Sequence, residues 1–253
     1  MCGIAGIFNF SNHQSIISHD YILKNMGHRG PDASNIWQTK DNKLTFFHTR
    51  LSIVDLSEKA NQPMDYMGKY QIVFNGEIYN YIYLKKKLEL KGYVFKTNSD
   101  TEVILALYNE YSKESFDMLE GIFAFAIYDY NSKKLIISRD LFGVKPIYYF
   151  HNSEQFIFSS EVKLINKIRK NLAKSSAGWI GYGLLGSVPE PYTIYENVYA
   201  LSPGNIKEID SYGNDIPLWS IFETEMIWSQ GNSIKETDDG GYVISGYATH
   251  NGV

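Results

Sequence analysis

The sequence has little cysteine, no strong excess of either charge and no long apolar run, and each absence excludes a class of protein. Cys2 is the one cysteine among 253 residues, which excludes an intrachain disulfide and is typical of a reducing compartment. A net charge of −4 gives no reason to expect a nucleic acid or an anionic membrane surface as partner. No stretch approaches the roughly 18 apolar residues that a spanning helix needs. The short apolar start also lacks the basic segment of a signal peptide, so we expect a cytoplasmic protein.

Metal binding is not expected either, because the six histidines show no paired ligand spacing. Aromatic residues are abundant, with 20 Tyr and 14 Phe, and they favour sheets. Strands arranged as hairpins between a few helices predict antiparallel sheets and an α+β fold. The predicted strands cover 2–10, 36–37, 44–51, 70–74, 93–96, 121–130, 134–140, 146–150 and 155–160, and the predicted helices cover 12–25, 80–91, 100–111 and 161–170.

The position of Cys2 gives this residue two interpretations. A lone cysteine is commonly a small buried hydrophobe. Directly behind an initiator methionine, however, it is left with a free α-amine once Met1 is removed, and cysteine is small enough for that removal. An α-amine titrates near pH 7.7–8.0 and a thiol near 8.5, so one residue would hold both a nucleophile and a base.

Three polar positions further along each allow a structural and a functional interpretation. Arg50, among strand residues, is either an edge charge or a receptor for a carboxylate, since a guanidinium presents a bidentate fork. Asn75-Gly76 after a strand is a strong hairpin-turn signal, yet an Asn amide and a Gly N–H also suit an oxyanion. Asp100 follows Ser99 at a helix start, where it either complements the helix dipole or pairs with a substrate ammonium.

Read together, a series of motifs in fixed order resembles the class II glutamine amidotransferase domain, which has an N-terminal nucleophile, and specifically that of glutamine-hydrolysing asparagine synthetase. The resemblance covers residues 2 to about 165. The motifs are MCGIAGIF, HRGPD, HTRLSIVDLS with NQPM, FNGEIYN, SDTEVIL, LEGIFAFAIYD, RDLFGVKPIYY and FSSEVK.

This resemblance implies a four-layer αββα sandwich of two antiparallel sheets and hydrolysis of L-glutamine to glutamate and ammonia. It implies that Cys2 attacks the amide carbon while its α-amine moves the proton, and that Asn75 and Gly76 stabilise the oxyanion. Arg50 would hold the substrate carboxylate, and Glu77 and Asp100 would lie on the ammonium side. The backbone that helps Arg50 would be that of Leu51, Ser52, Ile53 and Val54.

The chain also departs from that family. The pyrophosphate loop that would use ATP and Mg in a synthetase domain is absent from these 253 residues, so we expect no cofactor here and a separate domain or subunit as ammonia acceptor. We expect an amidotransferase domain over 2–212 and a linker over 213–227. Residues 228–253 resemble part of one β-propeller repeat or a fusion remnant, for which we expect low order.

Several functions stay open on this basis. The leading one is the ammonia-supplying half of asparagine synthesis. The chain could instead be a fragment or scaffold that is idle without its partner domain, or it could serve another acceptor. A homodimer is a further possible assembly. A binding module built on the last repeat would need further repeats, which the sequence lacks.

Overall fold

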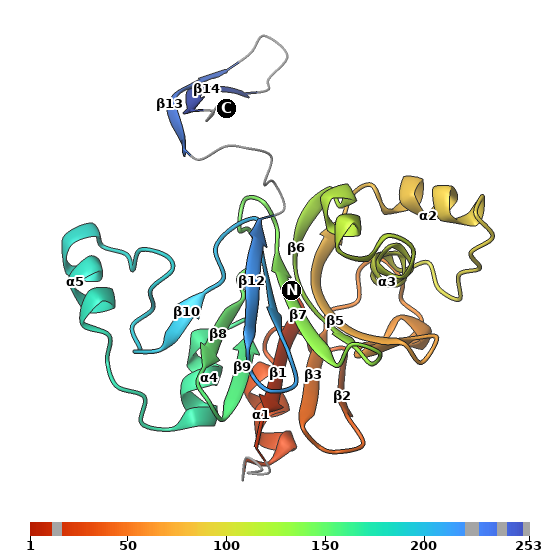
Figure 1. Cartoon of the computed structure of the whole chain (residues 1–253), viewed down its shortest axis with the longest axis horizontal. Helices are drawn as coiled ribbons and strands as arrows, with labels where there is room; N and C mark the ends of the chain where they lie inside the picture. The colour runs from red at the N-terminus through yellow and green to blue at the C-terminus, as the bar shows by residue number, and fades with distance from the viewer. Residues whose placement is uncertain (12–16, 221–227, 237–241, 250–253) are drawn as a thin grey trace. The chain divides into compact units, whose positions relative to one another are not determined.

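The computed structural model describes residues 1–11, 17–220, 228–236 and 242–249 (Figure 1). Its contacts divide the chain into two units, Met1–Ile221 and Phe222–Val253. The larger unit holds two six-stranded sheets with helices on their outer faces. The α+β fold and its antiparallel sheets are therefore as predicted.

The first sheet places the start of the chain in its interior. Its strand order is β10-β8-β9-β1-β3-β2, and every neighbouring pair is antiparallel. Strand β1 lies between β3 and β9, with Ala5 opposite both Phe47 and Ser159. The strands are β1 (Gly3–Asn9), β2 (Ala33–Gln38), β3 (Leu44–Arg50), β8 (Tyr148–His151), β9 (Gln155–Ser159) and β10 (Val198–Ala200).

The second sheet has the order β12-β11-β7-β6-β5-β4 and is antiparallel throughout. Strand β5 pairs with β6 along its whole length, whereas the short β4 covers only Tyr70 to Ile72 on the other side. Beyond Ile72, this edge of β5 has no strand partner among the residues that the structure describes. The strands are β4 (Met64–Tyr66), β5 (Tyr70–Ile78), β6 (Gly121–Asp129), β7 (Lys134–Arg139), β11 (Asn205–Ile209) and β12 (Asp215–Ser220).

Three apolar clusters hold four layers together. Between the sheets, Phe8 and Phe46 of the first pack with Val73 and Ile137 of the second. The outer face of the first sheet is covered by α1 (His19–Met26) and α4 (Val162–Arg169), and that of the second by α2 (Tyr81–Glu89) and α3 (Asp100–Tyr111). Burial on both faces explains the aromatic-rich strands. Two short 3-10 turns (Glu58–Ala60 and Ser112–Met118) and helix α5 (Ser176–Leu185) complete the unit.

The start of α3 is capped by Ser99, while Glu102 holds the loop before it. The Ser99 side chain accepts from the Thr101 N–H at 3.1 Å, as expected of an N-cap. The Glu102 carboxylate instead accepts from the Lys96 and Thr97 N–H groups at 2.9 and 2.7 Å. These bonds hold 96–97 as a loop against the helix, so the predicted strand over 93–96 is wrong.

Three further expectations change. Asn75 and Gly76 lie inside β5, so the hairpin-turn interpretation of this pair is wrong; pairing with Ala124 and Phe123 keeps the segment extended. Residues 215–220, expected in a linker, form β12 and extend the second sheet through β11. The helix predicted over 12–25 begins at His19, and 12–16 lie outside the described residues.

The smaller unit, within the described residues, is one antiparallel hairpin. Its strands are β13 (Trp228–Glu236) and β14 (Tyr242–Thr249), with an irregularity between Gly231 and Ser233.

Candidate active site

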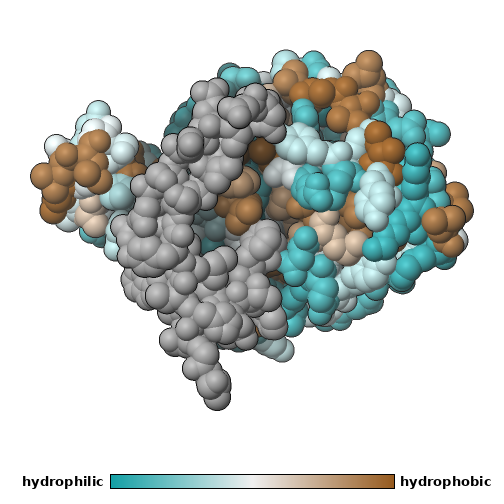
Figure 2. Space-filling view, turned by 90° about the horizontal axis from the view of Figure 1, so that it is seen from above, coloured by the Kyte–Doolittle hydropathy of each residue, from teal (hydrophilic) through white to brown (hydrophobic). Residues whose placement is uncertain are grey.

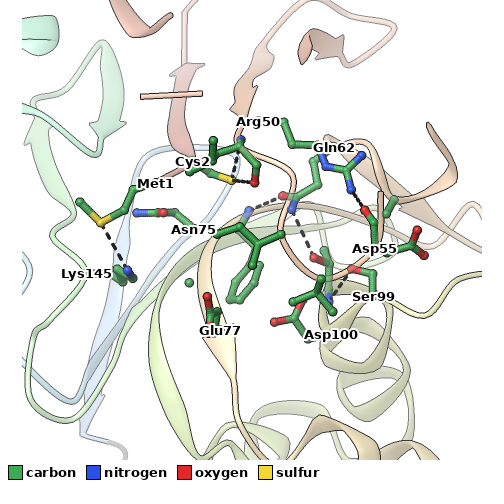
Figure 3. A pocket seen from close by; sticks show the side chains of 17 residues that line it. Met1, Cys2, Arg50, Asp55, Gln62, Asn75, Glu77, Ser99, Asp100 and Lys145 are labelled. Carbon is green, nitrogen blue, oxygen red and sulfur yellow. Dashed lines mark hydrogen bonds between the residues drawn. The ribbon is translucent and has the colours of Figure 1, made fainter. Parts of the chain in front are cut away.

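One pocket gathers nearly all of the predicted site residues (Figure 3). Nine of the ten line it: Cys2, Arg50, Leu51, Ile53, Val54, Asn75, Gly76, Glu77 and Asp100. Ser52 is not among the lining residues, and its backbone N–H is bound at 2.7 Å by the Asp32 carboxylate. The pocket therefore joins the start of β1, the loop after β3, the free edge of β5 and the start of α3.

The Cys2 thiol lies against the loop that follows β3. Its Sγ accepts from the Leu51 N–H at 3.4 Å and lies 3.6 Å from the Leu51 carbonyl. Burial raises the pKa of the thiol, although the Leu51 N–H and the positive charges of the N-terminus and Arg50 oppose that rise. The thiol is thus protonated at neutral pH, and a base is needed to activate it.

The backbone of Cys2 is fixed from the other side by Arg29. The Arg29 Nε donates to the Cys2 carbonyl at 3.0 Å, and Glu161 accepts from its Nη1 at 3.3 Å. This clamp gives HRGPD, one of the sequence motifs, a structural role. Met1 still precedes Cys2, lines the same pocket and has its Sδ 3.3 Å from the Lys145 Nζ (Figure 3). As long as Met1 is present, the Cys2 nitrogen is an amide and cannot accept a proton.

The free edge of β5 supplies hydrogen-bond donors to the pocket. Gln62 Oε1 accepts from the Phe74 N–H at 2.6 Å, and Asp100 Oδ2 accepts from the Ile78 N–H at 3.1 Å. Because alternate residues of a strand present their N–H groups to the same edge, the Gly76 N–H faces the pocket between these two. Among the described side chains, the buried Asn75 Nδ2 has no hydrogen-bond partner.

Buried amide groups are almost always hydrogen-bonded, so an unpartnered one at a pocket wall indicates a ligand. The Asn75 amide and the Gly76 N–H belong to consecutive residues beside the Cys2 thiol. Gly76 has to be glycine here, since an added Cβ would lie 2.6 Å from the Phe123 Cα of β6. The arrangement can stabilise a negative oxygen that develops next to the thiol.

Arg50 provides the positive charge at the other end of the pocket. It is 7% exposed on the interior strand β3, so the interpretation as an edge charge is wrong. Its guanidinium donates to the Ser57 carbonyl at 2.9 Å, the Asn61 Oδ1 at 2.7 Å and the Asp55 carbonyl. In the described part of the chain no carboxylate forms an ion pair with Arg50, so its charge is available to an anionic ligand.

Asp100 supplies the opposite charge. Burial raises its pKa to about 6, and the nearby Glu77 adds to this rise, while the Ile78 and Thr101 N–H groups oppose it. At neutral pH the carboxylate is therefore ionised at an energetic cost. Asp100 and Glu77 form an acidic side that suits an ammonium group.

His48 is close to this site without being a base for it. It is fully buried on β3, and its Nε2 lies 3.3 Å from the Phe74 carbonyl of β5. Burial lowers the pKa of His48 to about 3, so the ring is neutral and donates to that carbonyl. This bond connects the two sheets one residue before Asn75.

Sequence reasoning assigned no role to several lining residues, among them Gln62, Thr101 and Lys145. Gln62 links β5 to α3, because its Nε2 donates to the Thr101 Oγ1 at 3.2 Å. The Lys145 N–H donates to the buried Asp140 carboxylate at 2.9 Å. All three stand inside motifs quoted above, NQPM, SDTEVIL and RDLFGVKPIYY. Membership of these motifs was the one sequence pattern that could have indicated their place at the site.

The two stacked antiparallel sheets and the pocket beside Cys2 are the arrangement expected of a glutamine amidotransferase domain. A sequence model of the family described as "Glutamine amidotransferase domain" matches residues 1–219, and the chain belongs to that family. The Bacillus subtilis (strain 168) protein named asparagine synthetase (glutamine-hydrolyzing) 1 is 40% identical over 210 residues, which are 81% of this chain and 33% of that protein. The Gibberella zeae protein named amidase chry2 is 35% identical over 175 residues, 64% of this chain and 26% of its own length.

Solved structures agree on the fold. The glutamine phosphoribosylpyrophosphate amidotransferase from Bacillus subtilis superimposes with a TM-score of 0.61 at 19% identity, over 89% of this chain and 50% of that one. The chain spans about a third of the length of the curated relatives it matches. Within the described residues, no helix has the length and apolar character to cross a bilayer.

Proposed function

We propose that the chain hydrolyses L-glutamine to L-glutamate and ammonia, with Cys2 as nucleophile. The observation that carries the proposal is the buried Asn75 amide, which has no partner among the described residues and lines the same pocket as the Cys2 thiol. A merely structural Asn would satisfy its amide within the protein.

Removal of Met1 has to precede catalysis, because hydrolysis of the Met1–Cys2 peptide bond converts the Cys2 amide nitrogen into an α-amine. The neutral amine takes the thiol proton, and Sγ forms a bond to the side-chain amide carbon of glutamine. The carbonyl π electrons move to oxygen, and the resulting oxyanion is held by the Asn75 amide and the Gly76 N–H. Such a donor contributes roughly 2.7–4 kcal/mol to the transition state.

Collapse of this intermediate releases ammonia. The ammonium form of the Cys2 amine donates its proton to the leaving nitrogen, the C–N bond breaks and a thioester with Cys2 forms. The amine, neutral again, then takes a proton from water, and the hydroxide attacks the thioester carbon. The C–S bond breaks, glutamate leaves and Sγ recovers its proton.

Opposite charges orient the substrate for these steps. The glutamine α-carboxylate pairs with Arg50, supported by backbone groups of the 51–54 loop, and the α-ammonium pairs with Asp100 and Glu77. Arg50 lacks a carboxylate partner among the described residues, and Asp100 is buried with a raised pKa, so each gains from a zwitterionic ligand.

The test is a glutaminase assay on the isolated chain with its N-terminus verified by mass spectrometry. The Cys2→Ala variant should lose turnover while its thermal unfolding stays unchanged, and a chain with Met1 blocked by an N-terminal tag should also be inactive. Full activity of the tagged chain would refute the α-amine as base. Inactivity of the correctly processed wild type would indicate a domain that is idle without its partner.

A second proposal concerns the acceptor of the ammonia. On the model of the Bacillus subtilis relative, we propose an amide-forming synthetase domain or subunit that makes asparagine from aspartate, and ATP and Mg would belong to that partner. The amidotransferase family also includes relatives with other names, such as the Gibberella zeae amidase, so another acceptor is the alternative. Asparagine formation on mixing the chain with candidate acceptors in the presence of aspartate, ATP and Mg distinguishes the two.

We further propose an amidotransferase domain that begins at residue 2 and includes β12, with 228–253 as a partial repeat or fusion remnant, and a cytoplasmic site of action. Limited proteolysis tests the division, because cleavage between the two units should leave glutaminase activity unchanged. Cell fractionation tests the compartment.

A further inference from the structure

Helix α5 has its apolar side chains on the outside. Its ten residues, SAGWIGYGLL, include no charged residue. Five large side chains are exposed, among them Ile180 at 62% and Leu184 at 79%. We call these five the α5 apolar face: Trp179, Ile180, Tyr182, Leu184 and Leu185.

Glycines form the side of α5 that faces the rest of the domain. Gly178 and Gly181 are its buried residues, and an added Cβ would clash with the Thr193 carbonyl at the first and with the Pro189 ring at the second. The helix therefore approaches the 189–194 segment as closely as a backbone can, and this contact leaves every large side chain outside.

The helix itself is well formed. The Ser175 side chain caps it by accepting from the Gly178 N–H at 3.1 Å, and Gly186 ends it in the left-handed conformation with φ 72°. Its exposed apolar side chains thus belong to a rigid, capped element, and not to a frayed end. Contiguous apolar surface of this kind marks an interaction site.

The α5 apolar face is connected to the mouth of the active-site pocket. The segment after α5 holds Glu190, which pairs with the buried Arg139 at 2.8 and 3.1 Å. Arg139 also donates to the Gly143 carbonyl at 2.7 Å and to the Lys145 carbonyl at 3.2 Å. The loop thus fixed exposes Phe142 at 77% and leads to Lys145 in the pocket wall.

Figure 2 shows hydrophobic residues (brown) gathered on the surface at the left of the view, where α5 projects from the larger unit. In the relative of Bacillus subtilis, two thirds of the polypeptide lie outside the part that this chain matches. A partner of that size can cover both α5 and the pocket mouth, where ammonia leaves.

We propose that the α5 apolar face is the docking surface for the ammonia-accepting polypeptide, the counterpart of the region that the longer relatives carry beyond this domain. The proposal rests on the proposed function. The partner is recognised by an apolar groove that takes up the helix, in the manner of helix-in-groove recognition.

Binding is measured by isothermal titration between the full chain and the remaining region of the Bacillus subtilis relative, produced separately and checked for folding by its ammonia-dependent asparagine synthesis. The double variant Ile180→Glu/Leu184→Glu should weaken binding by about 30-fold or more, as expected for central interface residues. The matched control is Ile82→Glu/Tyr83→Glu, which changes two apolar residues of α2 that are 55% and 67% exposed and should bind like the wild type.

Two outcomes overturn the proposal. In one, the α5 variant binds as tightly as the wild type, or no complex forms. In the other, sedimentation shows that the wild type is a dimer and the α5 variant a monomer, so that a second copy is the occupant. Glutaminase activity is measured in parallel with and without the partner, and a processed wild type that binds the partner but stays inactive in the complex would refute the proposed function and not the docking surface.

Discussion

Replacing Asp100 by Asn should stabilise the protein at neutral pH while it weakens glutamine binding. Asp100 is 5% exposed, and its folded-state pKa of about 6 compares with an ordinary value of 3.8. Folding thus shifts the pKa by about two units, and each unit corresponds to about 1.4 kcal/mol. Ionised Asp100 consequently costs the folded state about 3 kcal/mol above pH 7.

The sign of the pH dependence follows from proton binding. Between about pH 4 and 6 the folded chain keeps the Asp100 proton that the unfolded chain loses, so wild-type stability falls as pH rises through this window. The Asn variant lacks this term, and its side-chain oxygen can still accept from the Ile78 N–H. The variant should therefore match the wild type near pH 3.5 and exceed it by about 3 kcal/mol near pH 7.5.

Urea unfolding at several pH values measures this difference, and glutaminase kinetics measure the functional loss as a raised KM. The Glu89→Gln variant, on the exposed surface of α2, controls for the removal of one acidic charge. A variant less stable than the wild type at pH 7.5, or a stability difference that does not change with pH, would refute the reasoning.

Three further predictions concern the same pocket. Asn75→Ala should lower kcat about 10²- to 10³-fold with little change in KM or melting temperature, because Nδ2 bonds to no described protein group; an unchanged kcat would exclude this donor. Gly76→Ala should destabilise the fold by about 1–3 kcal/mol or more in urea unfolding, because its Cβ would meet the Phe123 backbone, and wild-type stability would contradict the strand geometry. Lys145→Met should move the acid limb of the kcat/KM profile about half a unit to one unit to higher pH, because the positive charge of Lys145, which lines the same pocket as Cys2, favours the neutral form of the α-amine. Lys145→Arg should restore the profile, and a loss of activity without a shift would indicate a structural role.

Local patterns predicted most of the fold. Alternating strands and hairpin turns predicted the antiparallel sheets, and the positions of β1 and β3 were close to those observed, whereas β5 runs past its predicted end at residue 74 to Ile78. The errors lie where a tertiary contact overrides a local preference. Asn75-Gly76 has the composition of a turn, yet pairing with β6 keeps it extended, and Glu102 bonds the backbone of a loop that had the composition of a strand.

The sequence allowed the residues of the site to be predicted, but not the contacts that each of them makes. The ordered motifs placed Cys2, Arg50, Asn75 and Asp100 in one pocket, since each stands in a motif typical of the family. No pattern could indicate that Ser52 would turn to Asp32, or that His48 would join the two sheets beside Asn75. Such contacts join residues that are 20 or more positions apart and depend on how the sheets stack.

The interior position of β1 sets an order of events during synthesis. Met1 must leave before Cys2 can act, yet β1 is enclosed by β3 and by β9, which ends at Ser159. The terminus is least constrained before the ribosome has added the residues up to β9, which takes roughly 8–30 s at 5–20 residues per second. A chain folded with Met1 in place would be a well-packed protein without a catalytic base. Maturation therefore depends on the rate of Met1 removal relative to the rate at which β1 pairs with β3 and β9.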